Sequence, residues 1–381
     1  MNENQSYTGV EVGPIRPPSE ANSLLLRITR NCPWNKCKFC GLYKGEKFSA
    51  RPTQHVLEDI AIIKQCIDVF EKGENDGRKT LLHDLQDKHG ENGHWAYYTA
   101  MNWYNNGMES IFLQDANSMV VKPEAMIEIL ETLRKYFPDV ERITTYARSQ
   151  TISKISDENL QRMADAGLNR IHIGMESASD KVLELVKKGV DKATHILGGK
   201  KVKKAGIELS EYYMPGLGGN EYSEQNAIQT ADAINQINPD FIRIRTLALP
   251  DQTELADDYK KGVFTRTNDV KMVEELLLFV ENLDGITSTL KSDHILNLLQ
   301  DVEGKFPEDK PKMIRVIKDF LALNKTEQLI FRLGRRSGVM KSLSDLHNPK
   351  RRQLTESIMS EYNINESNID MATDARIKQF I

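Results

Sequence analysis

The stretch LLLRITRNCPWNKCKFCG, residues 24–41, joins a β-prone apolar run to three closely spaced cysteines. Its first six residues predict a β-strand over 24–29, because apolar and β-branched side chains favour the pleated backbone. Cys32, Cys37 and Cys40 follow in a C-x4-C-x2-C loop, so the thiols leave the carboxyl end of that strand. Sheets of parallel strands carry their functional sites at this edge, which makes the loop the first candidate site.

Further β-prone runs follow, and one or more helical stretches separate each run from the next. They cover residues 110–113, 142–146, 170–173, 207–213 and 241–247. Parallel neighbours need long crossover connections, so strands that alternate with helices predict an α/β fold with a parallel sheet. A full eight-unit barrel would need more than the one further strand candidate at 286–290. We therefore expect an incomplete (β/α)6 TIM-like barrel of parallel strands with an α-rich C-terminal extension.

The pattern also divides the chain into a core and flanking segments. We expect an N-terminal arm over 1–20, the core barrel over 21–250, a segment over 251–322 that completes or covers the barrel, and a charged helical tail over 323–381. The tail contains a basic cluster of Arg332, Arg335 and Arg336. Within the core, residues 71–108 form an aromatic-rich insertion with Trp95, Tyr97, Tyr98, Trp103 and Tyr104. These rings can pack a helix against the barrel or cap a substrate, and both alternatives remain open.

The overall composition is that of an ordinary globular protein. Of 381 residues, 39% are hydrophobic and 28% are charged, which argues against disorder. Lys and Arg number 51 and Asp and Glu 55, for a net charge of −4, so the chain lacks the broad basic surface of most nucleic-acid binders. We expect no nucleic-acid partner. The apolar runs are too short for a membrane span and the N-terminus lacks a signal-peptide pattern, so we expect a cytoplasmic protein.

The three clustered thiols suggest a metal site. Three thiolates can hold three irons of a [4Fe-4S] cluster and leave the fourth iron open, and the basic neighbours Arg30, Lys36 and Lys38 would offset the cluster's charge. A zinc site would need a fourth ligand, for which His55 is the nearest candidate. Three unliganded cysteines are the other alternative. Cys66 stands alone and is expected to be a buried apolar side chain.

The loop resembles the signature of the radical S-adenosylmethionine (SAM) superfamily, which is C-x3-C-x2-C with an aromatic residue before the third cysteine. Phe39 occupies the aromatic position, and this chain has one extra residue between the first two cysteines. Residues 170–177 resemble the fourth-strand motif of the subgroup that contains oxygen-independent coproporphyrinogen oxidase. The resemblance implies that Glu176 binds SAM and that Lys188, twelve residues on, contacts the SAM carboxylate.

The same resemblance suggests further cofactor-binding residues. Gln114 and Asp115 end the second strand, where the superfamily has a glycine-rich turn at the methionyl amine of SAM; Asp115 could equally cap the following turn. Residues 207–219 resemble the fifth strand and its turn, whose end approaches the adenosine, and they include Tyr212. Phe39 completes the set of expected cofactor contacts.

Three more residues are candidates for substrate binding. On the strand over 241–247, Arg243 and Arg245 alternate with apolar residues and would point into the barrel, where a charge needs a partner. An anionic ligand or an internal salt bridge would supply that partner. His294 follows Asp293 and the last strand candidate, and it could transfer protons, bind substrate or make a hydrogen bond at a helix start.

The resemblance implies an oxygen-sensitive radical SAM enzyme, an oxidoreductase or a transferase. In such an enzyme a reduced [4Fe-4S] cluster cleaves SAM to a 5′-deoxyadenosyl radical, which abstracts hydrogen from substrate. We expect an anionic small molecule as substrate and an external electron donor such as flavodoxin or ferredoxin. The alternative is a non-catalytic haem- or tetrapyrrole-binding protein on the same scaffold.

Overall fold

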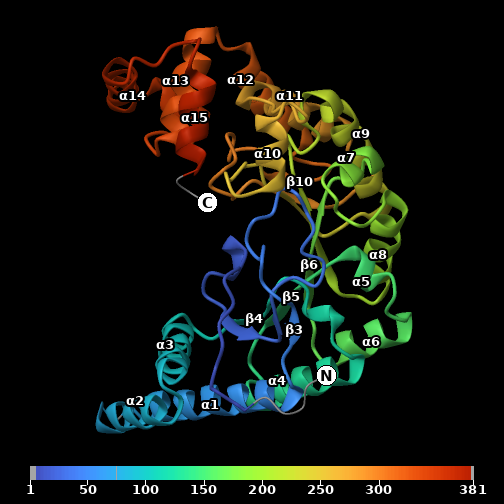
Figure 1. The fold of residues 1–381 in the computed structure, drawn as a ribbon, viewed down its shortest axis with the longest axis vertical. Helices are drawn as coiled ribbons and strands as arrows, with labels where there is room; N and C mark the ends of the chain where they lie inside the picture. The colour runs from blue at the N-terminus through green and yellow to red at the C-terminus, as the bar shows by residue number, and fades with distance from the viewer. Residues whose placement is uncertain (1–5, 74, 379–381) are drawn as a thin grey trace. The chain divides into compact units, whose positions relative to one another are not determined.

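The computed structural model describes residues 6–73 and 75–378 and divides into two compact units (Figure 1). The N-terminal unit comprises Met1–Asn35, Tyr43–Ile173 and Lys200–Leu209, and the C-terminal unit comprises Lys36–Leu42, Gly174–Gly199 and Ser210–Ile381. The expected arm over 1–20 and tail over 323–381 each end in residues outside the described part, namely 1–5 and 379–381. Cys32 belongs to the N-terminal unit, and Cys37 and Cys40 belong to the C-terminal unit.

The main sheet follows the order β1-β4-β5-β6-β7-β8-β9-β10. The bounds are β1 Leu24–Arg27, β4 Ser110–Gln114, β5 Arg142–Ala147, β6 Arg170–Glu176, β7 Glu208–Tyr213, β8 Phe241–Ile244, β9 Thr289–Lys291 and β10 Gly304–Lys305. The pairings from β1 to β6 and from β7 to β9 are parallel, and β10 pairs antiparallel with β9. The α/β fold and all the predicted strands are confirmed. The further candidate becomes β9, a parallel strand beside β8, while β8 ends at Ile244, earlier than expected.

A second, two-stranded sheet was not predicted, because two-residue strands have no recognisable periodicity. It consists of β2 (Thr29–Arg30) and β3 (Ser49–Ala50), which pair antiparallel. Thr29 lies opposite Ala50 and Arg30 opposite Ser49. The loop that contains the cysteines therefore begins and ends at this one pairing.

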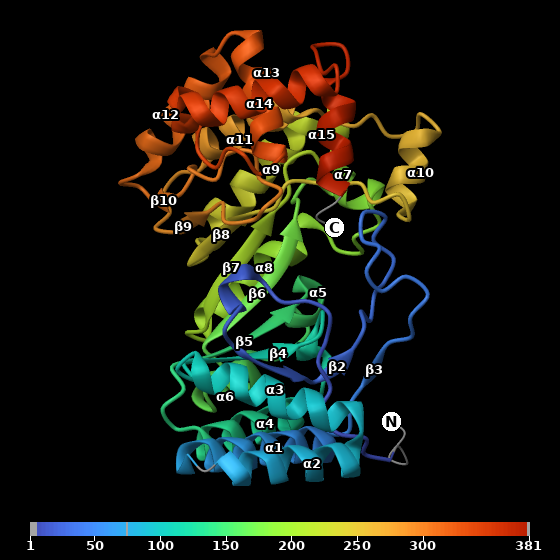
Figure 2. The same ribbon diagram turned by 90° about the vertical axis from the view of Figure 1, so that its left-hand side faces the viewer.

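Helices pack together within the N-terminal unit. They are α1 Thr53–Lys72, α2 Asn75–His89, α3 Glu91–Asn105, α4 Pro123–Tyr136, α5 Ser149–Ile152 and α6 Asp157–Asp165, with short 3-10 turns η1 Pro18–Glu20 and η2 Ser118–Val120. Figure 2 shows α1 beside α2, α3 and α4, and α1 contacts all three. Cys66 lies fully buried in α1, where burial raises the pKa of its thiol to about 12, so the prediction that it is a core residue is confirmed.

The aromatic-rich insertion becomes α2 and α3, and its rings divide between core and surface. Trp103 is fully buried, donates from Nε1 to the Ser110 carbonyl oxygen at 2.8 Å, and packs edge-on against Phe137 with ring centroids 5.0 Å apart. Trp95 and Tyr98 are 50% and 45% exposed. Trp103 therefore packs α3 against the core, as one of the two alternatives expected. Trp95 and Tyr98 do not have this role.

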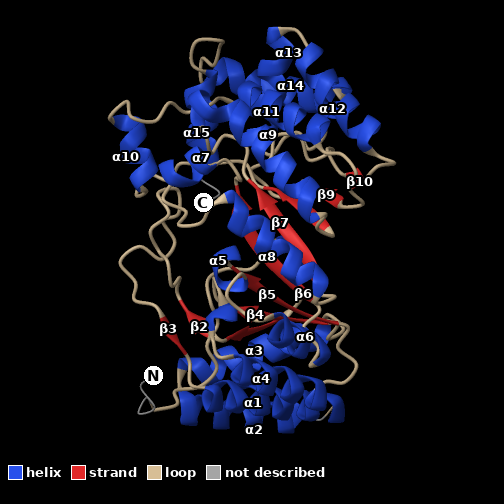
Figure 3. Ribbon diagram, turned by 90° about the vertical axis from the view of Figure 1, so that its right-hand side faces the viewer, coloured by secondary structure: helices blue, strands red, loops and turns tan. Residues whose placement is uncertain are grey.

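The C-terminal unit is rich in helix. Its helices are α7 Asp180–Leu185, α9 Gly219–Ile237, α10 Glu254–Lys260, α11 Asp269–Asn282, α12 Lys310–Ala322, α13 Lys325–Arg336, α14 Pro349–Glu361 and α15 Ile369–Ile377, with the 3-10 turn η3 Leu343–His347; α8 Lys192–Lys204 contributes to both units. Figure 3 shows α9 and α11 next to each other, in agreement with their contacts. Within residues 6–73 and 75–378, no helix has the length and apolar character that a membrane crossing requires.

The basic cluster of the tail lies in the interior of this unit. Arg332, Arg335 and Arg336 are all buried, and Arg332 and Arg336 form ion pairs with Asp269 at 3.4 and 2.5 Å. Burial by itself would raise the pKa of Asp269, but the two guanidinium groups outweigh it and lower that pKa. The ion pairs therefore fix α13 to the start of α11.

A buried carboxylate organises the turn that follows β7. Glu275 on α11 accepts hydrogen bonds from the Tyr213 hydroxyl at 2.8 Å, the Gly216 backbone N–H at 3.1 Å, the Ser223 hydroxyl at 2.6 Å and the Asn226 amide at 2.7 Å. Four donors from the β7 turn and α9 thus converge on one side chain. Because each buried donor needs an acceptor, Glu275 determines the conformation of this turn.

We predict that Glu275→Ala lowers the free energy of unfolding by about 3 kcal/mol or more, because it leaves four buried donors without an acceptor. Urea unfolding of the full chain measures the effect. Glu274→Ala is the matched control: Glu274 is exposed and pairs only with Lys271, so its loss should cost about 0.5 kcal/mol or less. Equal costs for the two variants would contradict the role given to Glu275.

Candidate functional site

The first part of the cysteine loop is held within the N-terminal unit. Asn31 adopts a left-handed conformation with φ of 66° and donates its backbone N–H to Asp115 at 3.4 Å. The backbone N–H of Asn35 donates to the Cys32 sulfur at 3.4 Å. This hydrogen bond fixes the turn that follows Cys32.

The second part of the loop is held within the C-terminal unit. The Cys40 backbone N–H donates to the Cys37 carbonyl oxygen at 3.3 Å, which forms a tight turn. Between them, the Lys38 backbone bonds to the Val186 carbonyl oxygen and the Leu255 N–H, both at 2.9 Å. The Lys38 ammonium forms an ion pair with Asp258 at 2.6 Å. Lys38 was expected to offset the charge of a cluster. Its charge is instead compensated by the Asp258 carboxylate.

The cysteine donor set fits a [4Fe-4S] cluster with one open iron. Cys32, Cys37 and Cys40 are partly exposed, and none forms a disulfide. No three Cys, His, Asp or Glu side chains of the described chain lie close enough together to hold a single metal ion. A cluster does not require that proximity, because each thiolate binds its own iron. His55, the candidate fourth ligand of a zinc site, packs its ring against Tyr7 with centroids 5.4 Å apart.

Three of the predicted cofactor residues come together in the C-terminal unit. Glu176 ends β6 with φ of 66°, and its Oε1 lies 3.6 Å from the Lys188 Nζ. The same ammonium lies 5.5 Å from the centroid of the Phe39 ring, the residue just before Cys40. A Cβ at Gly174 would come within 2.6 Å of the Glu176 carboxylate, so the glycine leaves room for this side chain. The result is an acid, a base and an aromatic ring beside two of the three cysteines.

Glu211 on β7 belongs to this group and was not predicted. Its side chain is fully buried, and neither carboxylate oxygen has a hydrogen-bond partner among the described residues. Burial and the charge of Glu176 raise its pKa well above the usual value, and Lys188 acts in the opposite direction. The sequence contains a signal that could have identified Glu211: it is a charged residue in a strand of mostly apolar and aromatic residues. Arg243 was singled out in its own strand for the same reason.

Tyr212, the predicted adenosine contact, follows Glu211 on β7 and is partly buried. Tyr212 is next to Glu211 in sequence, and this is its only link to the group formed by Phe39, Glu176 and Lys188. Its role in cofactor binding stays a prediction.

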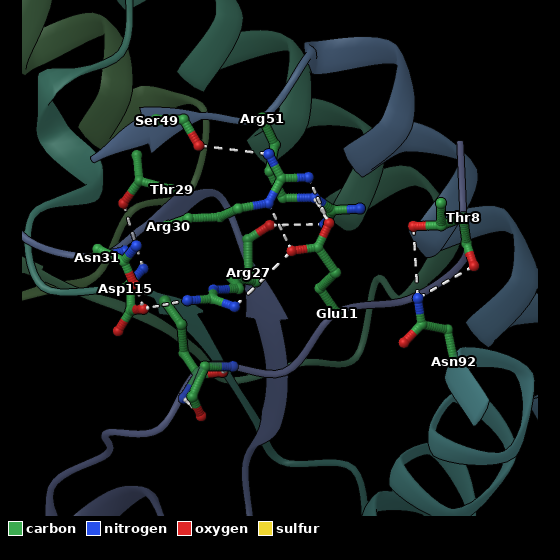
Figure 4. A network of polar contacts seen from close by, with 12 residues as sticks. Thr8, Glu11, Arg27, Thr29, Arg30, Asn31, Ser49, Arg51, Asn92 and Asp115 are labelled. Carbon is green, nitrogen blue, oxygen red and sulfur yellow. Dashed lines mark hydrogen bonds and ion pairs between the residues drawn. The ribbon is translucent and has the colours of Figure 1, made fainter. Parts of the chain in front are cut away.

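Gln114 and Asp115 differ from expectation, because the structure gives both side chains other partners. Gln114 accepts the Gly13 N–H at 2.8 Å and donates to the carbonyl oxygens of Gly13 at 3.1 Å and Ile15 at 2.6 Å. Asp115 accepts from Arg27 at 2.9 Å (Figure 4). It also accepts from the Tyr43 hydroxyl. Gln114 therefore anchors the N-terminal arm, and Asp115 anchors the cysteine loop. The following turn, η2, has no side-chain cap, so the alternative that Asp115 caps it is wrong, and the cofactor roles of Gln114 and Asp115 stay predictions.

The predicted substrate residues lie in the C-terminal unit, where Arg243 and Arg245 have different environments. Arg243 is 4% exposed and forms an ion pair with Asp293 at 2.7 Å, which is the internal salt bridge left open by the sequence. Arg245 lies beyond the end of β8, contrary to the expected strand over 241–247, and it is exposed. Neither arginine is a buried charge that needs an anionic ligand.

His294 makes a local hydrogen bond within a turn, and no helix starts here as the alternative expected. Its Nδ1 accepts the Leu296 backbone N–H at 3.2 Å. Burial and the charge of Arg245 lower its pKa to about 4, and Asp293 offsets this only in part. The ring is therefore neutral at physiological pH.

A cluster of ion pairs in the N-terminal unit supports the start of the loop (Figure 4). Glu11 accepts two hydrogen bonds from Arg30 at 2.7 and 2.6 Å and forms ion pairs with Arg51 at 3.2 Å and Arg27 at 3.8 Å. Burial alone would raise the pKa of Glu11, but the hydrogen bond from Arg30 and the three positive charges lower it. Arg51 also pairs with Asp59 on α1. This network connects the arm, β1, β2 and α1.

Comparisons with known proteins agree with the sequence resemblance. Residues 98–231 match the family model described as the Radical SAM superfamily; the matched stretch contains Glu176, Lys188, Glu211 and Tyr212 and begins after the cysteine loop. A tRNA uridine(34) acetyltransferase from Methanocaldococcus infernus is 24% identical over 120 residues, which are 31% of this chain and 22% of that protein. An uncharacterized protein of Methanocaldococcus jannaschii is 26% identical over 113 residues, 30% of this chain and 34% of that protein. The chain thus spans about a fifth to a third of the length of these relatives.

Among solved structures, coproporphyrinogen III oxidase from Escherichia coli, described as a radical SAM enzyme, is 14% identical with a TM-score of 0.44 over 65% of this chain and 50% of that one. The Elp3 protein of Methanocaldococcus infernus is 17% identical with a TM-score of 0.41 over 52% of each chain. Members of the matched superfamily use a [4Fe-4S] cluster and SAM. Residues 98–231 are therefore the part of the chain that is similar to the radical SAM superfamily.

Proposed function

We propose that Cys32, Cys37 and Cys40 bind a [4Fe-4S] cluster and that the protein cleaves SAM reductively to start hydrogen abstraction from a substrate. When bound, the cluster supplies the electron that breaks the sulfonium bond of SAM, and the resulting 5′-deoxyadenosyl radical removes a hydrogen atom. The observation that carries this proposal is the grouping of Glu176, Lys188 and Phe39 next to the Cys37–Cys40 turn in one compact unit.

The charges of this group match those of an amino acid. The methionyl part of SAM has an ammonium and a carboxylate, and Glu176 and Lys188 offer the opposite charges 3.6 Å apart. The second carboxylate oxygen of Glu176, Oε2, is buried and accepts no hydrogen bond from the described chain. It is therefore free to accept one from the ammonium or from a ribose hydroxyl. Lys188 would pair with the carboxylate, since its ammonium can be shared among several acceptors.

Glu211 would complete the polar surroundings of the cofactor. A buried carboxyl with no acceptor or donor nearby is most stable when it is protonated, and the negative charge of Glu176 reinforces this preference. In the neutral form it can donate one hydrogen bond to a bound ligand. Glu211 would thus hold a proton beside the Glu176 side chain.

The nature of the substrate is a separate matter. The salt bridge of Arg243 with Asp293 and the exposure of Arg245 remove the charge argument for an anionic substrate.

An external electron donor such as flavodoxin or ferredoxin is still part of the proposal. Among the described residues, the one cysteine outside the loop is the buried Cys66. The formation of 5′-deoxyadenosine from SAM and dithionite under anaerobic conditions separates this enzyme from a haem- or tetrapyrrole-binding protein.

We predict that anaerobically reconstituted protein contains about four irons and four sulfides per chain. Cys32→Ala, Cys37→Ala and Cys40→Ala should each abolish the bound sulfide and the formation of 5′-deoxyadenosine, because each removes an iron ligand. Iron and sulfide analysis together with the 5′-deoxyadenosine assay measures both effects. Cys66→Ala is the control and should retain the cluster, since its thiol lies in the core of α1. Bound zinc without sulfide in the wild-type protein would rule out the cluster.

We predict that Lys188→Met and Glu176→Gln each weaken SAM binding by about 1.5–3 kcal/mol, or roughly 10- to 150-fold in Kd, while the cluster stays assembled. Each change removes one charge that faces the amino-acid part of SAM. Equilibrium dialysis with labelled SAM measures Kd. Lys187→Met is the matched control, because this neighbouring lysine is exposed and pairs with Glu254 at 3.0 Å. If Lys188→Met binds SAM as tightly as Lys187→Met does, the assignment of Lys188 is wrong.

We predict that Glu211→Gln becomes progressively more stable than the wild type as the pH rises from 5 to 8. The folded-state pKa of Glu211 is raised above its ordinary value near 4.5, so the wild type loses stability as the pH rises from there toward the folded-state pKa. Glutamine does not titrate and avoids this loss, which should reach about 1–3 kcal/mol. Urea unfolding of the cluster-free full chain at several pH values measures it. Glu208→Gln, at an exposed position of the same strand, should show no such trend.

A further inference from the structure

The N-terminal unit contains a pocket that the proposed function does not use. Its volume is about 330 Å³, and it is lined by Glu11, Val12, Arg27, Asn92 and Trp95. The arm, the end of β1 and α3 of the aromatic-rich insertion each contribute to its walls. This volume is at the lower end of the range for small-molecule sites and fits a ligand of one or two rings.

The position of the pocket associates it with the functional edge of the sheet. Arg27 is the last residue of β1, and the strand's carboxyl end leads directly into β2 and the cysteine loop. Ligands of parallel α/β sheets bind at this edge. Arg27 therefore lines the pocket from the same strand end that positions the start of the loop.

Trp95 forms an apolar wall that the fold does not explain. Its ring is 50% exposed, whereas Trp103 on the same helix is fully buried in the core. The indole N–H makes a long hydrogen bond of 3.4 Å to Glu91, one turn earlier. A large aromatic face that lines a pocket and contributes little to the core is suited to stacking against a flat ligand.

The other lining residues are mostly polar, and contacts with neighbouring side chains and backbone hold them in place. The Arg27 guanidinium is fixed by Asp115 at 2.9 Å and Glu11 at 3.8 Å, yet its buried Nε has no acceptor in the described part of the chain. The Asn92 amide donates to the Thr8 carbonyl oxygen at 3.1 Å, which leaves its own oxygen as an acceptor. Close approach of the arm to α3 depends on Gly9, because a Cβ there would lie 2.8 Å from that of Asn92.

We propose that this pocket binds a planar nitrogen heterocycle such as a nucleobase, which is the part of the substrate that the enzyme recognises. The ring stacks on Trp95, and its polar edge, which has both donors and acceptors, meets Asn92, Glu11 and Arg27. The assignment of the ring to the substrate rests on the proposed function, whereas the binding of the ring to the pocket does not.

The test measures binding of adenosine, guanosine, cytidine and uridine to the full chain with its cluster, by equilibrium dialysis, with ribose as the non-aromatic reference. At least one nucleoside should bind about tenfold or more tightly than ribose, and Trp95→Ala should remove that preference, because stacking provides most of it. Tyr98→Ala, which removes another exposed ring of α3 outside the pocket lining, should leave it unchanged. Equal binding of ribose and all four nucleosides, or an effect of Tyr98→Ala as large as that of Trp95→Ala, would overturn the proposal.

A second measurement separates the substrate from the adenine of SAM. Trp95→Ala should bind SAM with the wild-type Kd, since the proposed SAM contacts are Glu176, Lys188 and Phe39. A tenfold loss of SAM affinity in Trp95→Ala would mean that the pocket holds the cofactor's own adenine, which overturns the assignment to substrate. If the wild type forms no 5′-deoxyadenosine but binds a nucleoside through Trp95, the proposed function fails and the heterocycle site stands.

Discussion

The carboxylate of Glu11 is the constraint on which the start of the functional region depends. It faces three guanidinium groups, those of Arg27, Arg30 and Arg51, and these belong to the end of β1, to β2 and to the residue after β3. Glu11 lies on the arm, far along the chain from Arg51, so its contacts join segments that the local chain does not hold together. Because burial would favour the neutral acid, the arginines must lower the pKa of Glu11 for the network to form. One arm residue thus fixes where the cysteine loop begins and ends.

The same network explains why the arm belongs to the functional region although it contains no predicted site residue. Gln114, at the end of β4, holds Gly13 and Ile15 of the arm, and Asp115 holds Arg27 and Asn31. The polar residues at two neighbouring strand ends are therefore committed to the arm and the loop. In the superfamily resemblance these positions face the cofactor, and here Asp115 also holds Arg27, which lines the Trp95 pocket.

The sequence predicts what depends on local pattern and misses what depends on distant partners. The strands follow from β-prone runs between helices, and burial of Cys66 follows from its place in an apolar helix face. The salt bridge of Arg243 joins residues fifty positions apart, so the sequence could only leave it as one of two alternatives. Arg245 was placed inside because β8 was expected to continue past Ile244. Glu211 was missed because the resemblance directed attention to the neighbouring Tyr212, although a buried carboxyl in a strand needs more explanation than a tyrosine.

The three ionisable groups near the end of β6 do not balance in charge. Glu176 and Glu211 can hold two negative charges, and Lys188 supplies one positive charge, all within one compact unit. With no ligand, burial and the charge of Glu176 raise the pKa of Glu211, which favours its neutral, protonated form. A ligand that brings an ammonium group supplies the missing positive charge and makes that proton easier to lose. The chain's own residues therefore favour a cationic group at this point, and the ammonium of an amino acid meets that requirement.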